Sequence, residues 1–532
     1  MGGHSDDYGD YEDYDDYDYY DDYDDYDDYD DQCVSGGPTS ISLPKLKSIT
    51  KTKSEPKAKT TDRPRRSSAH SKASLLKLCP LEPTAELKQV MDSQTPSTCV
   101  AVCGHVDAGK STLMGHFFVK LGEANVSSVK RLEKTATASR KGSFHFAWVF
   151  DEGEDERARG VTIDMCIKRF QSTSRHFVVV DTPGHKDFVP TMVSGAMIAD
   201  AAIVVVDGSD FETGFDKGGQ TKEHLQLLRA LSILNLVIVV NKMDSLTTPY
   251  SQETFHSIRD RMTSYLTSLK FNMEKVQFVP ASAYYGQNFF PKDLPAALSE
   301  WYPGPTLVEA LEQLPVTRYG GDPFSAVVID RANCANDARL TLKVMSGWIR
   351  PPSSVLVQPA NLVASLKHIT PDLSDPSTRC TVIQRGDIVD EAVLGGIDPT
   401  LVGPGSVVCH PEHPLDNLTT LLLHVVVFDG VVPLIPGQWF SGYFHTAAVN
   451  VKITKLVCLY DGKSKVDTPK LLSASQSGII RVLVDGGSVS VKCRGTKDKH
   501  TATSLSRSVL RRDGLSVCAG VVVDESFVNA KL

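Results

Sequence analysis

Cys99–Lys120 reads CVAVCGHVDAGKSTLMGHFFVK and decides the fold, because it places a glycine-rich loop between an apolar strand and a helix-like segment. Within it, Gly104–Ser111 matches the pattern GxxxxGK[ST]. The glycines of such a loop let backbone N–H groups curl around phosphate oxygens, and the following helix N-terminus adds its dipole. Lys110 would neutralise charge on the β- and γ-phosphates, and the Ser111 hydroxyl can ligate magnesium. A chance glycine-rich turn is the alternative, and the strand-loop-helix setting argues against it. The predicted phosphate-site residues are Gly104, His105, Val106, Asp107, Ala108, Gly109, Lys110, Ser111 and Thr112.

Apolar, β-rich runs alternate with helix-period segments downstream of this loop. The runs are RHFVVVD, AAIVVVD, LNLVIVVN and KVQFVP, and segments such as TKEHLQLLRALSI and ETFHSIRDRMTSYLTSLKF lie between them. This alternation predicts a doubly wound, mostly parallel α/β sheet over residues 99–317. After about Arg318 the helical pattern ends, and short strands punctuated by Gly, Pro and Asp favour two β-barrel domains, 318–415 and 416–532.

The segment NKMD at Asn241–Asp244 separates ATP from GTP, which the glycine-rich loop alone leaves open. It follows an apolar strand, and a doubly wound sheet binds its ligand at such strand ends. The Asp244 carboxylate can accept hydrogen bonds from N1–H and the exocyclic amine of guanine, whereas adenine would leave it unpaired. Buried hydrogen bonds of this kind can discriminate between bases by about 10⁴ or more. Ser282 and Ala283, after the next strand, are placed to close over the base with backbone N–H groups. The sequence therefore predicts GTP and GDP as ligands, with base-site residues Asn241, Lys242, Asp244, Ser282 and Ala283.

Asp181–Gly184 ends the strand HFVVVD and has the features of a switch. Asp181 would hold magnesium through water, and the Gly184 N–H could bond the γ-phosphate, so loss of that phosphate frees the segment. An ordinary turn residue at a strand end is the alternative for Asp181. The next residue, His185, is a lone histidine after a turn, which is usually a surface residue, so its position alone predicts no role.

Charge is distributed unevenly along the chain. Residues 1–31 contain 16 acidic and no basic residues, 32–98 contain 12 basic and 5 acidic residues, and 99–532 contain 44 of each. The acidic Asp/Tyr tract repels itself and has no aliphatic side chains to bury, which predicts disorder, as an interaction tail or a solvated extension. Residues 32–98 read as a flexible basic linker, within which SLLKLCPLEPTAELKQVMD could form one helix that docks a partner. Because the charges of residues 99–532 balance, net charge gives no argument that the body binds nucleic acid.

Composition also bears on the compartment. The apolar fraction of 41% is ordinary for a soluble globular protein, and no apolar stretch reaches the roughly 18 residues that could span a bilayer. The acidic N-terminus does not resemble a signal peptide. The 11 cysteines contain no CxxC pair, which fits reduced thiols rather than a disulfide framework or a zinc site. These features predict a cytoplasmic protein without a membrane helix.

Val102–Asn288 resembles the translational GTPases related to elongation factor Tu, with all the phosphate- and base-binding motifs included. Lys141–Phe144, Ala147–Val149 and Glu156–Asp164 look like the long switch I of the eukaryotic and archaeal branch that contains elongation factor one-alpha. The resemblance implies ribosome-stimulated hydrolysis of GTP with Mg²⁺, three domains, and contact with ribosomal RNA. The barrels match more weakly, through Gly386-Asp387 and Leu510-Arg511.

The same resemblance implies roles for residues that no motif explains. Thr162 would be the second magnesium-ligating hydroxyl, beside Ser111 and Asp181. Val106 and Val161 would form an apolar gate beside His185, which would orient the attacking water, so these three residues are the catalytic candidates.

Within the branch, three segments look least like the elongation factor: His185–Pro190, Ser194–Ala196 and Phe215–His224. They resemble the release-factor and ribosome-rescue GTPases. Gly160–Thr162 reads GVT, whereas the release factor commonly carries Lys in the middle position, so the rescue GTPase that partners Pelota is favoured. This member would be a monomer when free and would deliver the Pelota-type decoding-factor relative to ribosomes stalled on messenger RNA. The alternatives are a termination or elongation GTPase and a non-hydrolysing, GTP-bound adaptor for RNA decay.

Departures from the family pattern occur at three places. Thr182 replaces the usual small residue before Pro183, Val161 is smaller than the common Ile, and Arg350–Ser353 interrupts a turn where the first barrel often has Gly-Asp. None of these changes removes a predicted phosphate, magnesium or base ligand.

Overall fold

The computed structural model describes residues 78–122, 146–149, 166–183, 188–216, 219–316, 321–332, 336–372, 381–429, 431–461, 464–495 and 504–529. The predictions for the acidic tract and most of the basic linker concern residues 1–77 and lie outside this range. Four predicted site residues also lie outside the described residues: Val161, Thr162, Gly184 and His185. In the part of the chain that the structure describes, no helix is long and apolar enough to cross a membrane.

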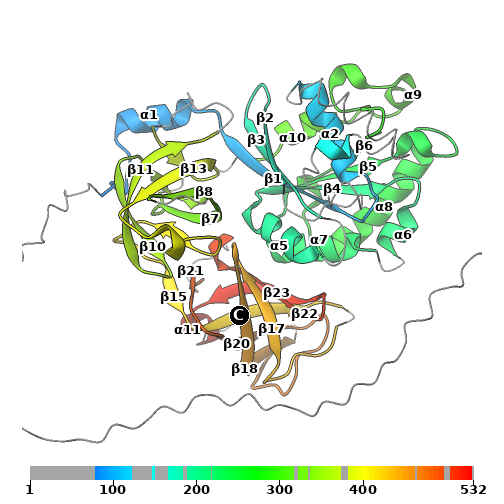
Figure 1. Cartoon of the computed structure of the whole chain (residues 1–532). Helices are drawn as coiled ribbons and strands as arrows, with labels where there is room; N and C mark the ends of the chain where they lie inside the picture. Colours follow the sequence, from blue (N-terminus) through cyan, green and yellow to red (C-terminus); the bar gives the residue numbers. More distant parts are fainter. Residues whose placement is uncertain are drawn as a thin grey trace, which may run out of the picture. The chain divides into compact units, whose positions relative to one another are not determined.

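The first domain is built on a six-stranded sheet with the order β2-β3-β1-β4-β5-β6 (Figure 1). All neighbouring pairs are parallel except β2 with β3. Because successive side chains of a strand point to opposite faces, Ala101 and Cys103 enter one core while Val100 and Val102 enter the other. The predicted doubly wound α/β domain is therefore confirmed. Its strands are β1 (Ser97–Gly104), β2 (Cys166–Gln171), β3 (His176–Asp181), β4 (Ala201–Asp207), β5 (Leu236–Asn241) and β6 (Val276–Pro280).

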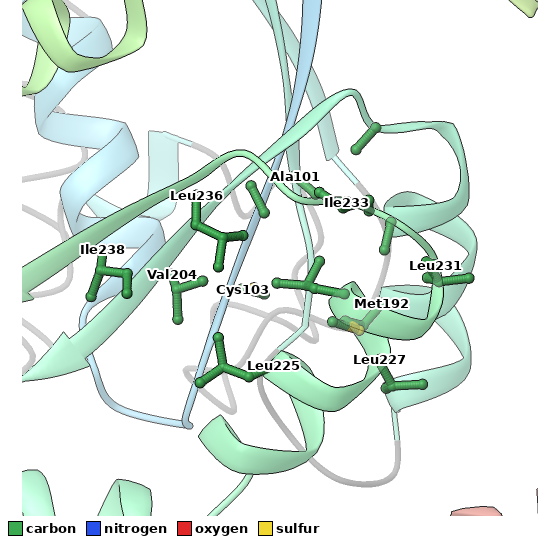
Figure 2. Close-up of a cluster of buried hydrophobic side chains, with 14 of the residues drawn as sticks. Ala101, Cys103, Met192, Val204, Leu225, Leu227, Leu231, Ile233, Leu236 and Ile238 are labelled. Carbon is green, nitrogen blue, oxygen red and sulfur yellow. The ribbon is translucent and has the colours of Figure 1, made fainter. Parts of the chain in front are cut away.

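Helices cover both faces of this sheet. One core contains side chains of α5, α7 and α8, and the other contains side chains of α2 and α10. Figure 2 shows part of the first core, which includes Met192 of α5 and Leu225 of α7 together with Val204 and Ile238 of the sheet. This packing leaves the loops at the carboxyl ends of the strands free to build a site. Within the described residues of this domain the helices are α2 (Lys110–Leu121), α5 (Val189–Ile198), α6 (Phe211–Phe215), α7 (Thr221–Ala230), α8 (Gln252–Ser268), α9 (Ala296–Ser299) and α10 (Leu307–Glu312).

The next strands close into a barrel with the order β10-β11-β13-β8-β7-β14, and β9 pairs with β12 beside it. The turn that departs from the family pattern connects β9 to β10, and in it the Ser353 hydroxyl donates to the Arg350 carbonyl. The strands are β7 (Ser325–Ala332), β8 (Ala338–Ser346), β9 (Trp348–Ile349), β10 (Ser353–Gln358), β11 (Leu362–Thr370), β12 (Ile383–Gln384), β13 (Ile388–Gly395) and β14 (Val407–Cys409).

The helix predicted within the linker forms as α1 (Ala85–Ser93) and begins at Thr84, whose hydroxyl accepts from the Leu87 N–H. Met91 belongs to the core of the first barrel. Trp348 Nε1 donates to the Leu81 carbonyl at 3.1 Å. The helix therefore packs on a barrel of its own chain.

A second barrel follows, with the order β17-β22-β23-β16-β20-β18, closed by pairing of β17 with β18 and extended by β19. The predicted boundary at Leu415 falls between β14 and β15. The two predicted barrels are confirmed. The remaining elements are β15 (Asp416–Leu418), β16 (Thr420–Val427), β17 (Trp439–Phe444), β18 (Ala447–Asp461), β19 (Ser464–Asp467), β20 (Ser477–Val484), β21 (Val489–Val491), β22 (Arg507–Arg512), β23 (Leu515–Val523) and α11 (Glu525–Asn529).

Candidate functional site

The loop between β1 and α2 is shaped by two glycines that no other residue could replace without displacement of a neighbour. Gly104 has φ +146°, and a Cβ there would lie 2.2 Å from the Val205 carbonyl oxygen of β4. Gly109 precedes α2 with φ +86°, and a Cβ there would lie 2.4 Å from Asn241 Nδ2. The two glycines therefore let the loop approach β4 and the Asn241 side chain closely. Its binding of phosphate oxygens through backbone N–H groups stays a prediction.

Lys110 is buried although it carries a charge, with 7% of its surface exposed. Its ammonium donates to the His105 carbonyl at 2.9 Å and so reaches back across the loop. The positive charge therefore lies at the His105 carbonyl of the glycine-rich loop. Val106 and Thr112 are half-buried, and Asp107 is exposed with φ +60°.

Ser111 and Asp181 come together from two separate segments. The Ser111 hydroxyl donates to Asp181 Oδ2 at 3.0 Å, and Asp181 is fully buried at the end of β3. A hydroxyl and a carboxylate are oxygen ligands of the type that Mg²⁺ prefers. Thr182, which departs from the family pattern, directs its hydroxyl to the Val102 carbonyl of β1 at 2.5 Å. The departure therefore adds a hydrogen bond inside the sheet and leaves Asp181 in place.

Asn241 joins the two halves of the site. Its Nδ2 donates to the Ala108 carbonyl at 2.8 Å, and its Oδ1 accepts from the Ala283 N–H at 2.8 Å. One buried side chain thus ties the glycine-rich loop to the loop after β6. Ser282 is buried, and Asp244 is half-buried and accepts from the Ser245 hydroxyl at 3.0 Å.

Asp207 is a residue that the sequence analysis missed. Lys242 has φ +60° and donates to Asp207 Oδ2 at 2.6 Å. Burial raises the pKa of Asp207, but hydrogen bonds from Lys242 and Ser209 outweigh burial, so the pKa of the carboxyl is lowered. The Asp207 carboxylate therefore stays charged and anchors Lys242. In the sequence, Asp207 could have been recognised by its position at the end of the apolar run AAIVVVD. In the sheet it is paired with Asn241 of β5.

His105 contacts Gln220, a residue to which the sequence assigned no role in the site. Its Nδ1 lies against Gln220 Oε1, at the start of α7. The same helix carries His224, which is fully buried. Burial, with Lys110 and His105 nearby, lowers the pKa of His224 to about 3, so its ring is neutral. Gln220 and His224 therefore lie close to the glycine-rich loop.

Comparison with known proteins gives the family. Residues 95–316 match the family described as the elongation factor Tu GTP binding domain. An elongation factor 1 alpha-like protein of Schizosaccharomyces pombe is 33% identical over 441 residues, which cover 82% of this chain and 71% of that protein. This chain belongs to the elongation factor Tu and elongation factor 1-alpha superfamily of translational GTPases.

Other members extend the match across the barrels. Elongation factor 1-alpha of Staphylothermus marinus is 31% identical over 441 residues, which cover 82% of this chain and 98% of that protein. The Ski7 GTPase-like domain of S. cerevisiae, solved with GDP and inorganic phosphate, has a TM-score of 0.66 and 19% identity, over 83% of this chain and all of that one. At that identity the likeness shows the fold alone. Members of the superfamily hydrolyse GTP, and they generally act on ribosomes.

Proposed function

We propose that this chain is a ribosome-associated GTPase that delivers a Pelota-type decoding-factor relative to stalled ribosomes, for rescue and messenger RNA quality control. It binds GTP or GDP with Mg²⁺, acts in the cytoplasm and is a monomer when free. Three kinds of observation support this function: the family membership, the geometry of the site, and the sequence segments that distinguish members of the family.

The observation that carries nucleotide binding is the pair of 2.8 Å hydrogen bonds made by Asn241. They tie the glycine-rich loop to the loop after β6 at the carboxyl edge of the sheet, where doubly wound folds bind ligands. Asp244 supports guanine over adenine, since its carboxylate can accept from N1–H and the exocyclic amine. The loop that contains Ser282 and Ala283 would close over the base. In this structure the two N–H groups donate to the Gln287 carbonyl at 3.4 Å and to Asn241 Oδ1 at 2.8 Å.

Magnesium fits the oxygen donors of this site. Ser111 and Asp181 already lie 3.0 Å apart, and together with Thr162 they would hold the ion. When bound, Mg²⁺ neutralises charge on the β- and γ-phosphates. Lys110 would add a second positive charge at the same phosphates, and the Gly184 N–H would bond the γ-phosphate.

Hydrolysis would proceed by in-line attack of water on the γ-phosphate. His185 would orient that water, and Val106 and Val161 would form the gate that controls its approach. The free chain should hydrolyse GTP slowly, because partner activation in this reaction class contributes about 10³–10⁵ in rate. The ribosome is the proposed activating partner.

The support for a Pelota-type partner is in the sequence of three segments: His185–Pro190, Ser194–Ala196 and Phe215–His224. These segments resemble the release-factor and rescue GTPases rather than the elongation factor. Val161, in place of the Lys common in the release factor, favours the rescue GTPase.

A pull-down separates the candidate partners. The chain, loaded with a non-hydrolysable GTP analogue, should retain a Pelota-type protein and neither the stop-codon factor nor aminoacyl-tRNA. The chain loaded with GDP is the matched control and should retain less. Preferential capture of the stop-codon factor or of aminoacyl-tRNA would move the chain to termination or elongation.

A further inference from the structure

Tyr250 occupies an unusual backbone position beside the base loops. Its φ is +58°, in the left-handed region that a bulky side chain rarely adopts. The backbone is held on both sides: its N–H donates to the Met243 carbonyl at 2.8 Å, and its carbonyl accepts from Trp301 Nε1 at 3.0 Å. Strain of this kind persists only where the surroundings over-determine it, and it clusters at functional sites. The fold therefore fixes where the Tyr250 side chain points.

The Tyr250 hydroxyl donates to Gln287 Oε1. Gln287 in turn is paired with Ser282 through its backbone, since its N–H donates to the Ser282 carbonyl at 3.0 Å and its carbonyl accepts from the Ser282 N–H at 3.4 Å. Burial raises the pKa of Tyr250 to about 12, so the hydroxyl keeps its proton at neutral pH. The tyrosine therefore connects the segment after β5, which contains Asp244, to the loop after β6, which contains Ser282.

The loop after β6 is held at two points. Asn241 accepts from the Ala283 N–H at one end, and Tyr250 bonds Gln287 at the other. In the proposed function, guanine contacts Asp244 on one edge and the loop that contains Ser282 and Ala283 on another. Both sets of contacts form only if the spacing between the two loops matches the base.

We propose that the Tyr250–Gln287 contact is a brace that sets this spacing and thereby strengthens selection of guanine. The inference rests on the proposed guanine-nucleotide binding. Tyr250 does not itself touch the base in this account; it is a positioning residue that acts through the Ser282 loop.

The test compares Tyr250→Phe with Tyr302→Phe. The two tyrosines are matched, because each is 8% exposed and each hydroxyl makes a hydrogen bond. The Tyr302 hydroxyl lies 2.9 Å from the Phe278 and Pro305 carbonyls. Dissociation constants are measured for GDP and for IDP, which lacks the exocyclic amine that Asp244 would accept from. Thermal unfolding of each variant is measured alongside.

Tyr250→Phe should lower the ratio of the IDP to the GDP dissociation constant by about three- to tenfold, the range of one net hydrogen bond. Tyr302→Phe should destabilise the chain to a similar extent and leave the ratio at the wild-type value. Gln287→Met removes the acceptor of the same hydrogen bond and should reproduce the Tyr250→Phe ratio. The double variant should add nothing further, because both changes break one contact.

An unchanged ratio in both Tyr250→Phe and Gln287→Met, with wild-type GDP binding, overturns the brace and leaves the proposed function standing. So does a ratio that falls equally in Tyr302→Phe, since destabilisation alone would then explain it. A wild-type chain that does not bind GDP overturns the proposed function and the brace together. If Tyr250→Phe does not fold, Gln287→Met decides the question.

Discussion

Replacement of Gly109 by alanine would disturb the contacts of Asn241 at the centre of the site, and the structure allows the loss in the free energy of unfolding to be calculated. The new Cβ would lie 2.4 Å from Asn241 Nδ2, so the Asn241 side chain would have to leave its two hydrogen bonds of 2.8 Å. The positive φ costs a residue with a Cβ about 1 kcal/mol, and each lost hydrogen bond costs about 1 kcal/mol. The α/β domain should therefore lose roughly 3 kcal/mol, and its unfolding temperature should fall by roughly 6–12 °C.

Gly122→Ala is the matched control for that prediction. Gly122 has φ +82°, close to that of Gly109, but nothing lies within 4 Å of the Cβ that would be added. Gly122→Ala should therefore show only the conformational cost: a loss of about 1 kcal/mol in the free energy of unfolding and a fall of roughly 2–4 °C in the unfolding temperature. Differential scanning calorimetry measures both variants, and a GDP titration should show weaker binding for Gly109→Ala alone. Equal unfolding temperatures and equal GDP affinities in the two variants would refute the role assigned to Asn241.

Three other variants test separate parts of the site. Asp244→Asn should weaken GDP binding by about 10²–10⁴-fold, because charge-assisted hydrogen bonds to the base are lost. The same variant should bind XDP more tightly, because the 2-carbonyl of xanthine can accept a hydrogen bond from an amide. Titrations that show equal weakening for both nucleotides would contradict this base contact. Burial, with Lys110 as the next cause, lowers the pKa of His224 from 6.5 to about 3. Below about pH 6.5 the unfolded chain therefore takes up a proton at His224 that the folded chain does not. The free energy of unfolding should fall by about 2 kcal/mol between about pH 6.5 and pH 5. Denaturation of His224→Gln across that range should show a shallower slope, and an identical slope would remove His224 as the cause. His185→Ala should bind GTP normally but lose ribosome-stimulated turnover, and unchanged stimulated turnover would remove His185 from the mechanism.

The local motifs were predictable because phosphate binding needs neighbouring residues in the chain. Gly104–Ser111 combines a loop, a lysine and a helix N-terminus in one stretch, and its strand-loop-helix setting was readable from the apolar run before it. The fold class followed from the same alternation of apolar strands with helix-period segments. Both predictions depend on short-range patterns that single-sequence reasoning can read.

Contacts across the sheet were not predictable in the same way. The anchoring of Lys242 by Asp207 arises because β4 and β5 are neighbours, with Asp207 next to Asn241 in the register. The Tyr250–Gln287 contact likewise joins segments that follow different strands. Such pairs depend on strand order and on side-chain directions in three dimensions, which periodicity alone does not determine. The choice of partner depends on surfaces for which the sequence offers resemblance but no geometry.

Hydrolysis of GTP by the purified chain on empty ribosomes tests the central proposal most directly, with a Pelota-type protein, with the stop-codon factor, and with neither. The account predicts slow hydrolysis by the chain alone and strong stimulation only when ribosomes and the Pelota-type protein are both present. Stimulation by the stop-codon factor instead would assign the chain to termination, and no stimulation by either factor would contradict the rescue function and favour a GTP-bound adaptor.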